Sequence, residues 1–102
     1  MMDTKTLLAE AKARFNHNSA KAYLAEKFNA KLIVAEQGGL WKADAQTISL
    51  LNSFDHKQIV LIDTFNNPVQ VFRQDLLTKL QSVYDEVMID WYNEWKELEN
   101  KR

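Results

Sequence analysis

The chain contains no cysteine, which excludes a disulfide framework and thiol chemistry. Proline occurs once and glycine twice in 102 residues, so there is no Pro/Gly/Ser-rich linker, and we expect a single domain over residues 1–102. No apolar run approaches the roughly 20 residues that span a bilayer, and the first residues mix charges with apolar side chains, unlike a signal peptide. We therefore expect a soluble, cytoplasmic protein.

Sequence motifs for metal, phosphate and nucleotide binding are also missing. The two histidines, His17 and His56, each stand beside Asn or Asp, without the spaced His, Cys or carboxylate partners that a metal site needs. The glycine pair Gly38-Gly39 is not followed by the Lys-Ser/Thr of a phosphate loop. The sequence therefore predicts no metal, no other cofactor and no enzyme.

Asp63 is the one acidic residue placed as a catalytic carboxylate often is, directly after the apolar run 59–62. Glu36 is a potential partner carboxylate for acid/base chemistry. The alternative is that the Asp63 side chain accepts backbone hydrogen bonds at the start of the loop before Pro68. Because nothing in the sequence completes a catalytic set, we favour the role in the loop.

Charge is nearly balanced overall but differs between the two ends of the chain. The net charge is −1, with 46% hydrophobic and 26% charged residues, as in an average globular domain. Residues 1–31 hold six Lys or Arg against three acids, and residues 75–102 hold four against seven. This complementarity favours attraction between helices within the fold; head-to-tail self-association or an acidic surface for a basic partner is the alternative.

The N-terminal quarter has helical spacing in two pieces. Asp3 or Thr4 can cap a helix that carries apolar residues to Phe15, and the turn-forming segment 16–18 then interrupts it. A second helix is expected to run to Phe28. The sequence therefore predicts that the chain starts with a helical hairpin.

The middle of the chain alternates strands with one short helix. Residues 32–35 and 40–43 flank Gly38-Gly39 and predict a β-hairpin, and Asp44 can cap a helix over residues 45–53. Residues 59–62 are apolar on both faces and predict a central strand, followed after a loop of about five residues by a strand over 69–72. We predict an α+β fold in the order ααββαββα, with a three- or four-stranded, mainly antiparallel sheet packed by helices.

The last quarter, from Arg73 onward, predicts one long amphipathic helix. A helix of roughly 26 residues is about 39 Å long, whereas a compact domain of this size is only about 34 Å across. The helix is therefore expected to outrun its own core. Five large apolar residues on its second half are candidates for a protein interface, with packing against the N-terminal helices as the alternative. They are Met88, Trp91, Tyr92, Trp95 and Leu98.

Two aromatic–cation pairs suggest a different partner. Trp41 precedes Lys42, and Phe72 precedes Arg73, on or beside predicted strands. Such pairs are the ingredients of a stacking platform for single-stranded nucleic acid. The slightly acidic chain argues against a tight electrostatic binder, so nucleic acid remains the alternative to a protein partner.

Several stretches together resemble a small uncharacterised protein carried by contractile-tailed bacteriophages, especially marine ones. They are residues 15–21, 38–42 and 62–69 and the Trp-rich end; Phe72 departs from the likeness, because a polar cap is expected before the last helix. The resemblance implies a phage origin and production in a bacterial cytoplasm, and no activity. We therefore expect a non-enzymatic interaction module, such as a phage assembly factor, minor virion component or host-takeover protein, that binds another protein or forms a homodimer and contacts no membrane.

Overall fold

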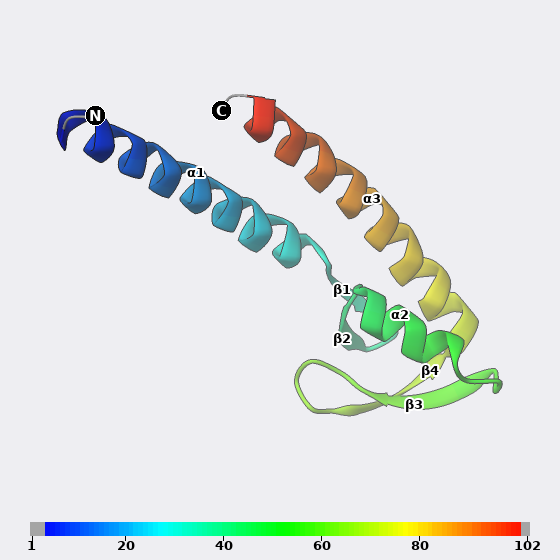
Figure 1. The fold of residues 1–102 in the computed structure, drawn as a ribbon. Helices are drawn as coiled ribbons and strands as arrows, with labels where there is room; N and C mark the ends of the chain where they lie inside the picture. Colours follow the sequence, from blue (N-terminus) through cyan, green and yellow to red (C-terminus); the bar gives the residue numbers. More distant parts are fainter. Residues whose placement is uncertain (1–3, 101–102) are drawn as a thin grey trace.

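A computed structural model describes residues 4–100, without the side chains of residues 4–7, 13 and 15. Two helices of equal length, α1 (Thr4–Lys31) and α3 (Arg73–Asn100), lie side by side and run in opposite directions (Figure 1). Between them the chain forms two β-hairpins and one short helix. These elements are β1 (Ile33–Glu36), β2 (Gly39–Lys42), α2 (Ala45–Asn52), β3 (Gln58–Ile62) and β4 (Pro68–Phe72).

The N-terminal helix is continuous, so the predicted break at residues 16–18 is wrong. Asn and His cost only a few tenths of a kcal/mol in a helix relative to good helix formers, and the surrounding segment is rich in alanine and lysine. His17 also gains a tertiary contact, because its Nε2 lies 3.1 Å from Glu99 Oε1 of α3. The expected cap at Asp3 lies outside the described residues, as does the Phe15 side chain.

The first hairpin pairs Glu36 with Gly39, and Gln37 and Gly38 alone form the turn. Both turn residues have positive φ, 49° and 80°, as a type I′ turn requires. Gly39 therefore lies in β2 and not in the turn, contrary to the prediction. A Cβ at Gly39 would lie 2.6 Å from Cζ2 of Trp41, so the packed indole explains this glycine.

The second hairpin is covered on one face only. Ile59, Leu61 and Val71 are buried, whereas Val60 and Ile62 are 62% and 61% exposed. The expected central position of this strand is therefore wrong, because β3 has only β4 as a strand neighbour, whereas cover on at least one face was expected and is present. The five-residue connection between them was predicted correctly.

The α+β class, the antiparallel pairing and the long C-terminal helix are confirmed. The four strands form two separate two-stranded sheets, and three helices are described instead of four. The sheets are joined by a backbone bond from Thr64 N–H to Leu40 O at 2.9 Å. The Gln37 side chain adds a second link, because its Oε1 accepts from Phe72 N–H at 2.7 Å.

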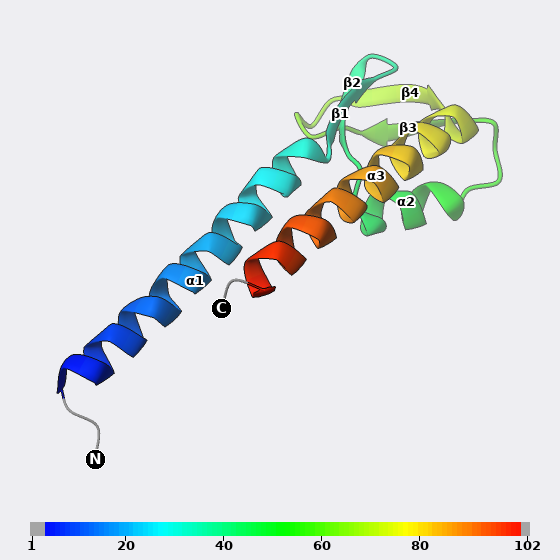
Figure 2. The ribbon, with the colours of Figure 1, turned by 90° about the horizontal axis from the view of Figure 1, so that it is seen from above.

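The molecule has a compact head and a protruding arm. The largest fully buried side chains all lie in the head or where α1 enters it: Phe28, Leu51, Val71, Leu76 and Leu80. The helical arm consists of residues 4–27 of α1 and residues 87–100 of α3, and it extends away from the hairpins and α2 (Figure 2).

The arm makes the whole chain elongated. The principal extents are 66, 25 and 20 Å, and the radius of gyration is 19.6 Å. A compact chain of this length has a radius of gyration of about 13 Å. The expectation that the last helix outruns the core is therefore confirmed. Within the described residues, no helix has the length and apolar character needed to cross a membrane.

Candidate protein interface on the helical arm

The five apolar residues predicted on the second half of α3 divide into two groups. Met88, Trp91 and Leu98 are half-buried and pack against the core. The Trp91 indole stacks on the Phe28 ring, with centroids 5.9 Å apart and planes 11° apart. For Trp91 the structure therefore shows the alternative, packing against the N-terminal helix, and Met88 and Leu98 are partly covered by the core.

Tyr92 and Trp95 lie on the exposed flank of the same helix. They are 58% and 40% exposed, and their rings stack with centroids 6.1 Å apart. Ile89, three residues before Tyr92, is 62% exposed. We call Ile89, Tyr92 and Trp95 the aromatic patch. Ile89 was missed from the sequence because it lies off the spacing of the buried residues; its distance of three residues from Tyr92 was the available signal.

A shallow groove continues from the aromatic patch toward the head. Its volume is about 760 Å³, and Ile89 lies at one end of it. Its other walls come mainly from polar residues of α3, with Asn52 of α2 at the opposite end. The groove therefore connects the aromatic patch to the side of α3 that faces α2.

Ion pairs hold the two helices of the arm together beside the patch. Lys27 Nζ donates to both Glu94 carboxylate oxygens, at 2.9 and 3.1 Å, and this hydrogen bond raises the pKa of Lys27. Glu99 Oε1 lies 3.0 Å from Lys21 Nζ and 3.1 Å from His17 Nε2. The bond from Lys21, followed by that from His17, lowers the pKa of Glu99.

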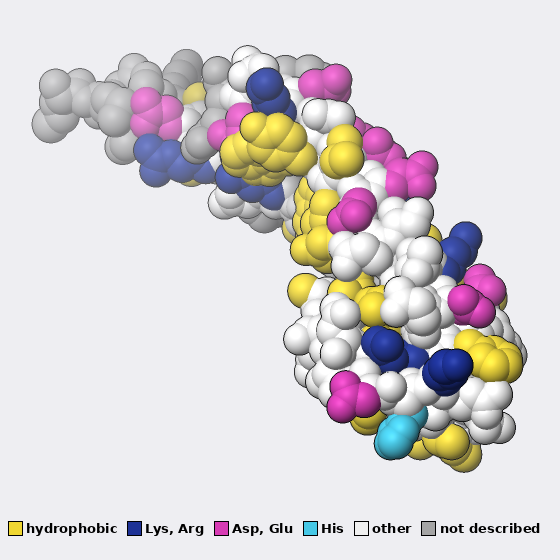
Figure 3. Space-filling view, turned by 90° about the vertical axis from the view of Figure 1, so that its right-hand side faces the viewer, with side chains coloured by type: hydrophobic (Ala, Val, Ile, Leu, Met, Phe, Trp, Pro, Cys, Tyr) yellow, Lys and Arg dark blue, Asp and Glu magenta, His cyan; other side chains and the backbone are white. Residues whose placement is uncertain are grey.

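These pairs show that the opposite charges of the two chain ends attract each other within one molecule. Further acidic residues remain on the outer side of α3, where Asp85, Glu86, Asp90 and Glu97 are all exposed. Figure 3 shows acidic side chains along α3, with hydrophobic side chains beside them. The arm therefore presents an apolar patch within an acidic surface.

The Asp63 side chain forms hydrogen bonds with the backbone of the loop between β3 and β4. Its Oδ1 accepts from the backbone N–H groups of Phe65 and Asn67, at 2.9 and 3.0 Å, and its Oδ2 accepts from Leu40 N–H at 3.2 Å. These bonds, that from Asn67 foremost, lower the pKa of the buried carboxyl group. The predicted role in the loop is confirmed.

A shallow groove of about 560 Å³ has both Asp63 and Glu36 in its walls. Both Asp63 oxygens already bind backbone amides, so the carboxylate is held as a structural acceptor. Among the described residues, no group of three His, Cys, Asp or Glu side chains is arranged to hold a metal ion. His17 lies on α1 against Glu99, and His56 lies in the loop before β3.

The two aromatic–cation pairs do not form a stacking platform. Trp41 is buried, and its Nε1 donates to Glu36 O at 2.8 Å. Arg73 donates to the carbonyl oxygens of His56 and Leu51, both at 3.3 Å. Lys42 and Phe72 are exposed. One of the two aromatic rings, Trp41, and one of the two cations, Arg73, are however engaged within the fold.

Comparison of the chain with protein-family models, with curated proteins and with solved structures gives no match.

Proposed function

We propose that this chain is a protein-interaction module and that the aromatic patch of the helical arm is its contact surface. The observation that carries the proposal is the exposed stack of Tyr92 on Trp95, next to exposed Ile89. Tyr and Trp are the residues most enriched at the energetic centres of protein interfaces. The free energy falls when a partner covers large apolar side chains that were exposed to water.

The residues beneath the patch favour a preorganised surface. The Trp91 side chain of α3 is held by its stack on Phe28 of α1. The Lys27–Glu94 and Lys21–Glu99 pairs join the two helices on either side of this stack. Aromatic side chains that are already held in a fixed arrangement lose less conformational entropy when a partner binds, which favours association. The arm therefore serves as a stiff support that presents the patch away from the head.

The biological setting is also part of the proposal. The likeness to proteins of contractile-tailed phages suggests a role in assembly, in the virion or in host takeover, in a bacterial cytoplasm. The elongated arm supports a non-enzymatic, structural or adaptor role, because the exposed features it offers are apolar and charged side chains and not a reactive cavity.

Site-specific photo-crosslinking tests the proposal. A photoreactive phenylalanine analogue at position 92 should give a protein adduct of defined mass in bacterial cells that express the full chain. The matched control carries the same analogue at position 23, because Tyr23 is exposed to a similar degree on the other helix of the arm. An adduct at position 92 that disappears when Ile89 and Trp95 are replaced by Ser supports the patch. Equal adducts at both positions, or none at position 92, would overturn it.

A further inference from the structure

Strand β3 pairs with β4 on one side and leaves its other edge unpaired. A backbone bond from Asp63 N–H to Asn67 O, at 3.0 Å, closes one end of this hairpin. Because bonded and non-bonded pairs alternate along an antiparallel ladder, every second residue of β3 turns its backbone N–H and C=O away from β4. None of the described residues bonds to these outward groups, which we call the free edge of β3. They belong to Gln58, Val60 and Ile62.

The opposite edge of the hairpin, formed by β4, is closed. Gln37 Oε1 accepts from Phe72 N–H at 2.7 Å, and Gln37 Nε2 donates to Phe72 O at 3.2 Å, so one side chain occupies both outward groups of that residue. At the other end of β4, Pro68 has no N–H to donate. Proteins protect edge strands in such ways, or with charged residues, against pairing with another chain. The β3 sequence QIVLI contains neither proline nor charge, so the free edge remains open to a further strand.

The side chains along the free edge are apolar and lie in water. Val60 and Ile62 are 62% and 61% exposed, whereas Ile59 and Leu61, which alternate with them, are buried. Side chains directly opposite each other on neighbouring strands pack together, so an added strand would cover Val60 and Ile62 with its own outer residues. In strand addition, backbone bonds supply the affinity and side-chain pockets supply the selectivity.

A pocket of about 160 Å³ lies beside the end of the free edge. Its walls include Leu61, which faces the core, and Ile62, which faces outward, so the pocket opens at the edge of the strand. Thr47 and Leu50 of α2 form another wall, and β4 contributes none of the described wall residues. Leu50 is 47% exposed. The residue of an added strand opposite Leu61 points to the core side of the sheet and would place its side chain in this pocket, against Leu50.

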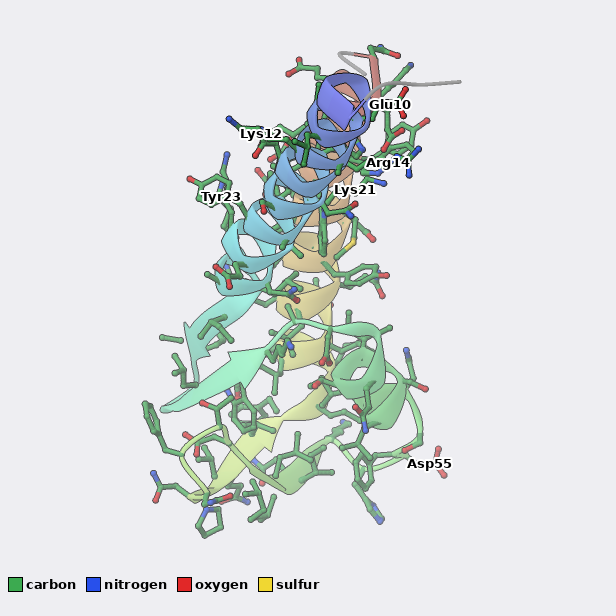
Figure 4. All side chains as sticks on the ribbon, turned by 60° about the vertical axis from the view of Figure 1, so that its left-hand side comes forward. Glu10, Lys12, Arg14, Lys21, Tyr23 and Asp55 are labelled. Atoms are coloured by element: carbon green, nitrogen blue, oxygen red, sulfur yellow. The ribbon has the colours of Figure 1, made fainter. Side chains whose placement is uncertain are left out.

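The rim of the pocket is positively charged. Lys42 of β2 lines it and is exposed, whereas the Asp63 carboxylate in the same wall is held by three backbone N–H groups. Asp44, two residues after Lys42, caps α2 by accepting from Thr47 N–H. Asp55, in the loop before β3, points outward from that loop and away from the strands (Figure 4). The charge at the pocket therefore favours a partner strand with an acidic residue at that end.

A second copy of this chain does not fit the pocket. The core-side residues of its β3, Ile59 and Leu61, are buried in its own head, so neither is free to enter a neighbour's pocket. An extended segment with both faces free meets the requirement.

We infer that the free edge of β3 accepts an extended peptide segment of a partner protein, which adds as a third, antiparallel strand. An acidic residue of the peptide lies near Lys42, the next residue covers Ile62, and the one after it enters the pocket. Antiparallel pairing continues the pattern of both hairpins and is slightly more stable per residue than parallel pairing. The free edge belongs to the head and the aromatic patch to the arm, so this inference does not depend on the proposed function.

Fluorescence anisotropy with a synthetic peptide tests the inference on the full chain. The probe is a fluorescein-labelled hexapeptide of sequence Glu-Val-Leu-Val-Thr-Thr, whose two valines pair with Ile62 and Val60 and whose leucine faces the pocket. N-methylation of both valines removes two bonds to β3 and should raise the Kd at least about tenfold. The matched control is N-methylated at the leucine and the first threonine, whose N–H groups point away from β3, and its Kd should stay within about twofold. No binding of the unmodified peptide at about 1 mM, or equal losses from both methylated peptides, would overturn the inference.

Variants at position 60 test the edge from the side of the protein. Val60→Pro removes an outward N–H and no bond to β4, and it should raise the peptide Kd at least about tenfold. Val60→Thr keeps the N–H and should bind within about twofold of the wild type. An equal Kd for Val60→Pro and Val60→Thr would overturn the inference. Circular dichroism checks that both variants fold; if Val60→Pro does not, the two methylated peptides still decide the question with the wild-type chain.

Two controls distinguish the free edge from the aromatic patch and from self-association. Ile89→Ser with Trp95→Ser in the arm should leave peptide binding unchanged, so the proposed function and this inference can fail separately. Sedimentation equilibrium should give the same mass for the wild type and Val60→Pro. A wild-type dimer that Val60→Pro dissociates would overturn the inference, because a second copy would then occupy the edge.

Discussion

The Phe28 ring lies nearly parallel to the Trp91 indole, and this stack joins the helical arm to the head. The centroids are 5.9 Å apart, and the Phe28 side chain is fully buried. The ammonium groups of Lys27 and Lys31 lie 5.1 and 4.9 Å from the Phe28 centroid, where the ring face attracts cations. Phe28 therefore closes the core at the point where the two long helices leave it.

Replacing Phe28 with Ala should lower the free energy of unfolding by about 3–5 kcal/mol, because the substitution leaves a cavity in a fully buried part of the core. Trp91→Ala should cost about 2–4 kcal/mol, since the indole is only half-buried. The two losses should not add, and a double-mutant cycle should show a coupling of about 0.5–1.5 kcal/mol. Urea denaturation followed by circular dichroism measures all three variants.

Trp95→Ala is the matched control for Trp91→Ala. Trp95 lies one helical turn further along α3, on the exposed flank. Its loss should cost about 1 kcal/mol or less, mainly through the stack on Tyr92. Equal losses for the two tryptophans would contradict the division of α3 into a buried and an exposed side.

The two glycines should respond differently to alanine. Gly38 has a φ of +80° with no atom within 4 Å of an added Cβ, so Gly38→Ala should cost about 1 kcal/mol of backbone strain. Gly39→Ala would place its Cβ 2.6 Å from the Trp41 ring, so the buried indole must move and the loss should reach about 2–3 kcal/mol. Thermal unfolding of both variants measures the difference, and a milder effect at Gly39 would show that Trp41 can shift freely.

Asp44 should contribute to stability as the cap of α2. Its Oδ1 accepts from Thr47 N–H at 2.9 Å, so Asp44→Ala should lower the free energy of unfolding by about 1 kcal/mol. Asp44→Ser should restore most of the loss, because a hydroxyl oxygen can accept the same bond. Asp55→Ala, an equal change of charge in the next loop, should have little effect. Similar losses at Asp44 and Asp55 would point to charge and not to capping.

The parts of the fold that depend on local chemistry were predictable from the sequence. Asp44 starts α2 as expected, because an N-cap needs only its own helix. The hairpins followed from β-branched segments and turn residues, although the position of the first turn was shifted by one residue. The reason for that shift is side-chain packing: Gly39 is required by the Trp41 ring, which is held in the buried core.

The parts that depend on distant contacts were not predictable. Residues 16–18 look like a helix break on their own, but α3 supplies Glu99 as a partner for His17. The apolar residues of β3 suggested a central strand, yet the two sheets remain separate and leave Val60 and Ile62 exposed. The sequence places a candidate interface on α3, but only the position of α1 decides that Trp91 is covered and Trp95 is not.

Asp63 makes stability depend on pH in a direction that its contacts fix. Three backbone N–H groups donate to its carboxylate, and all three bonds favour the charged form. The pKa of Asp63 is therefore lower in the folded chain than in the unfolded chain. The stabilisation is fully present above the unfolded-state pKa of about 4 and is lost as the pH falls through the lower folded-state value.

The variant Asp63→Asn should separate this effect from other acid-sensitive contacts, because Glu99 in the arm also has a lowered pKa. At pH 7 the variant should melt lower than the wild type by on the order of 5 °C, since an amide oxygen cannot replace both carboxylate acceptors. As the pH falls below about 4, the wild type should lose its advantage and the two melting curves should converge. Asp55→Asn, on the exposed loop after α2, is the control and should follow the wild type at every pH. A constant difference between wild type and Asp63→Asn from pH 7 to pH 2 would mean that the carboxylate does not titrate with unfolding, and that the loop depends on the shape of the side chain and not on its charge.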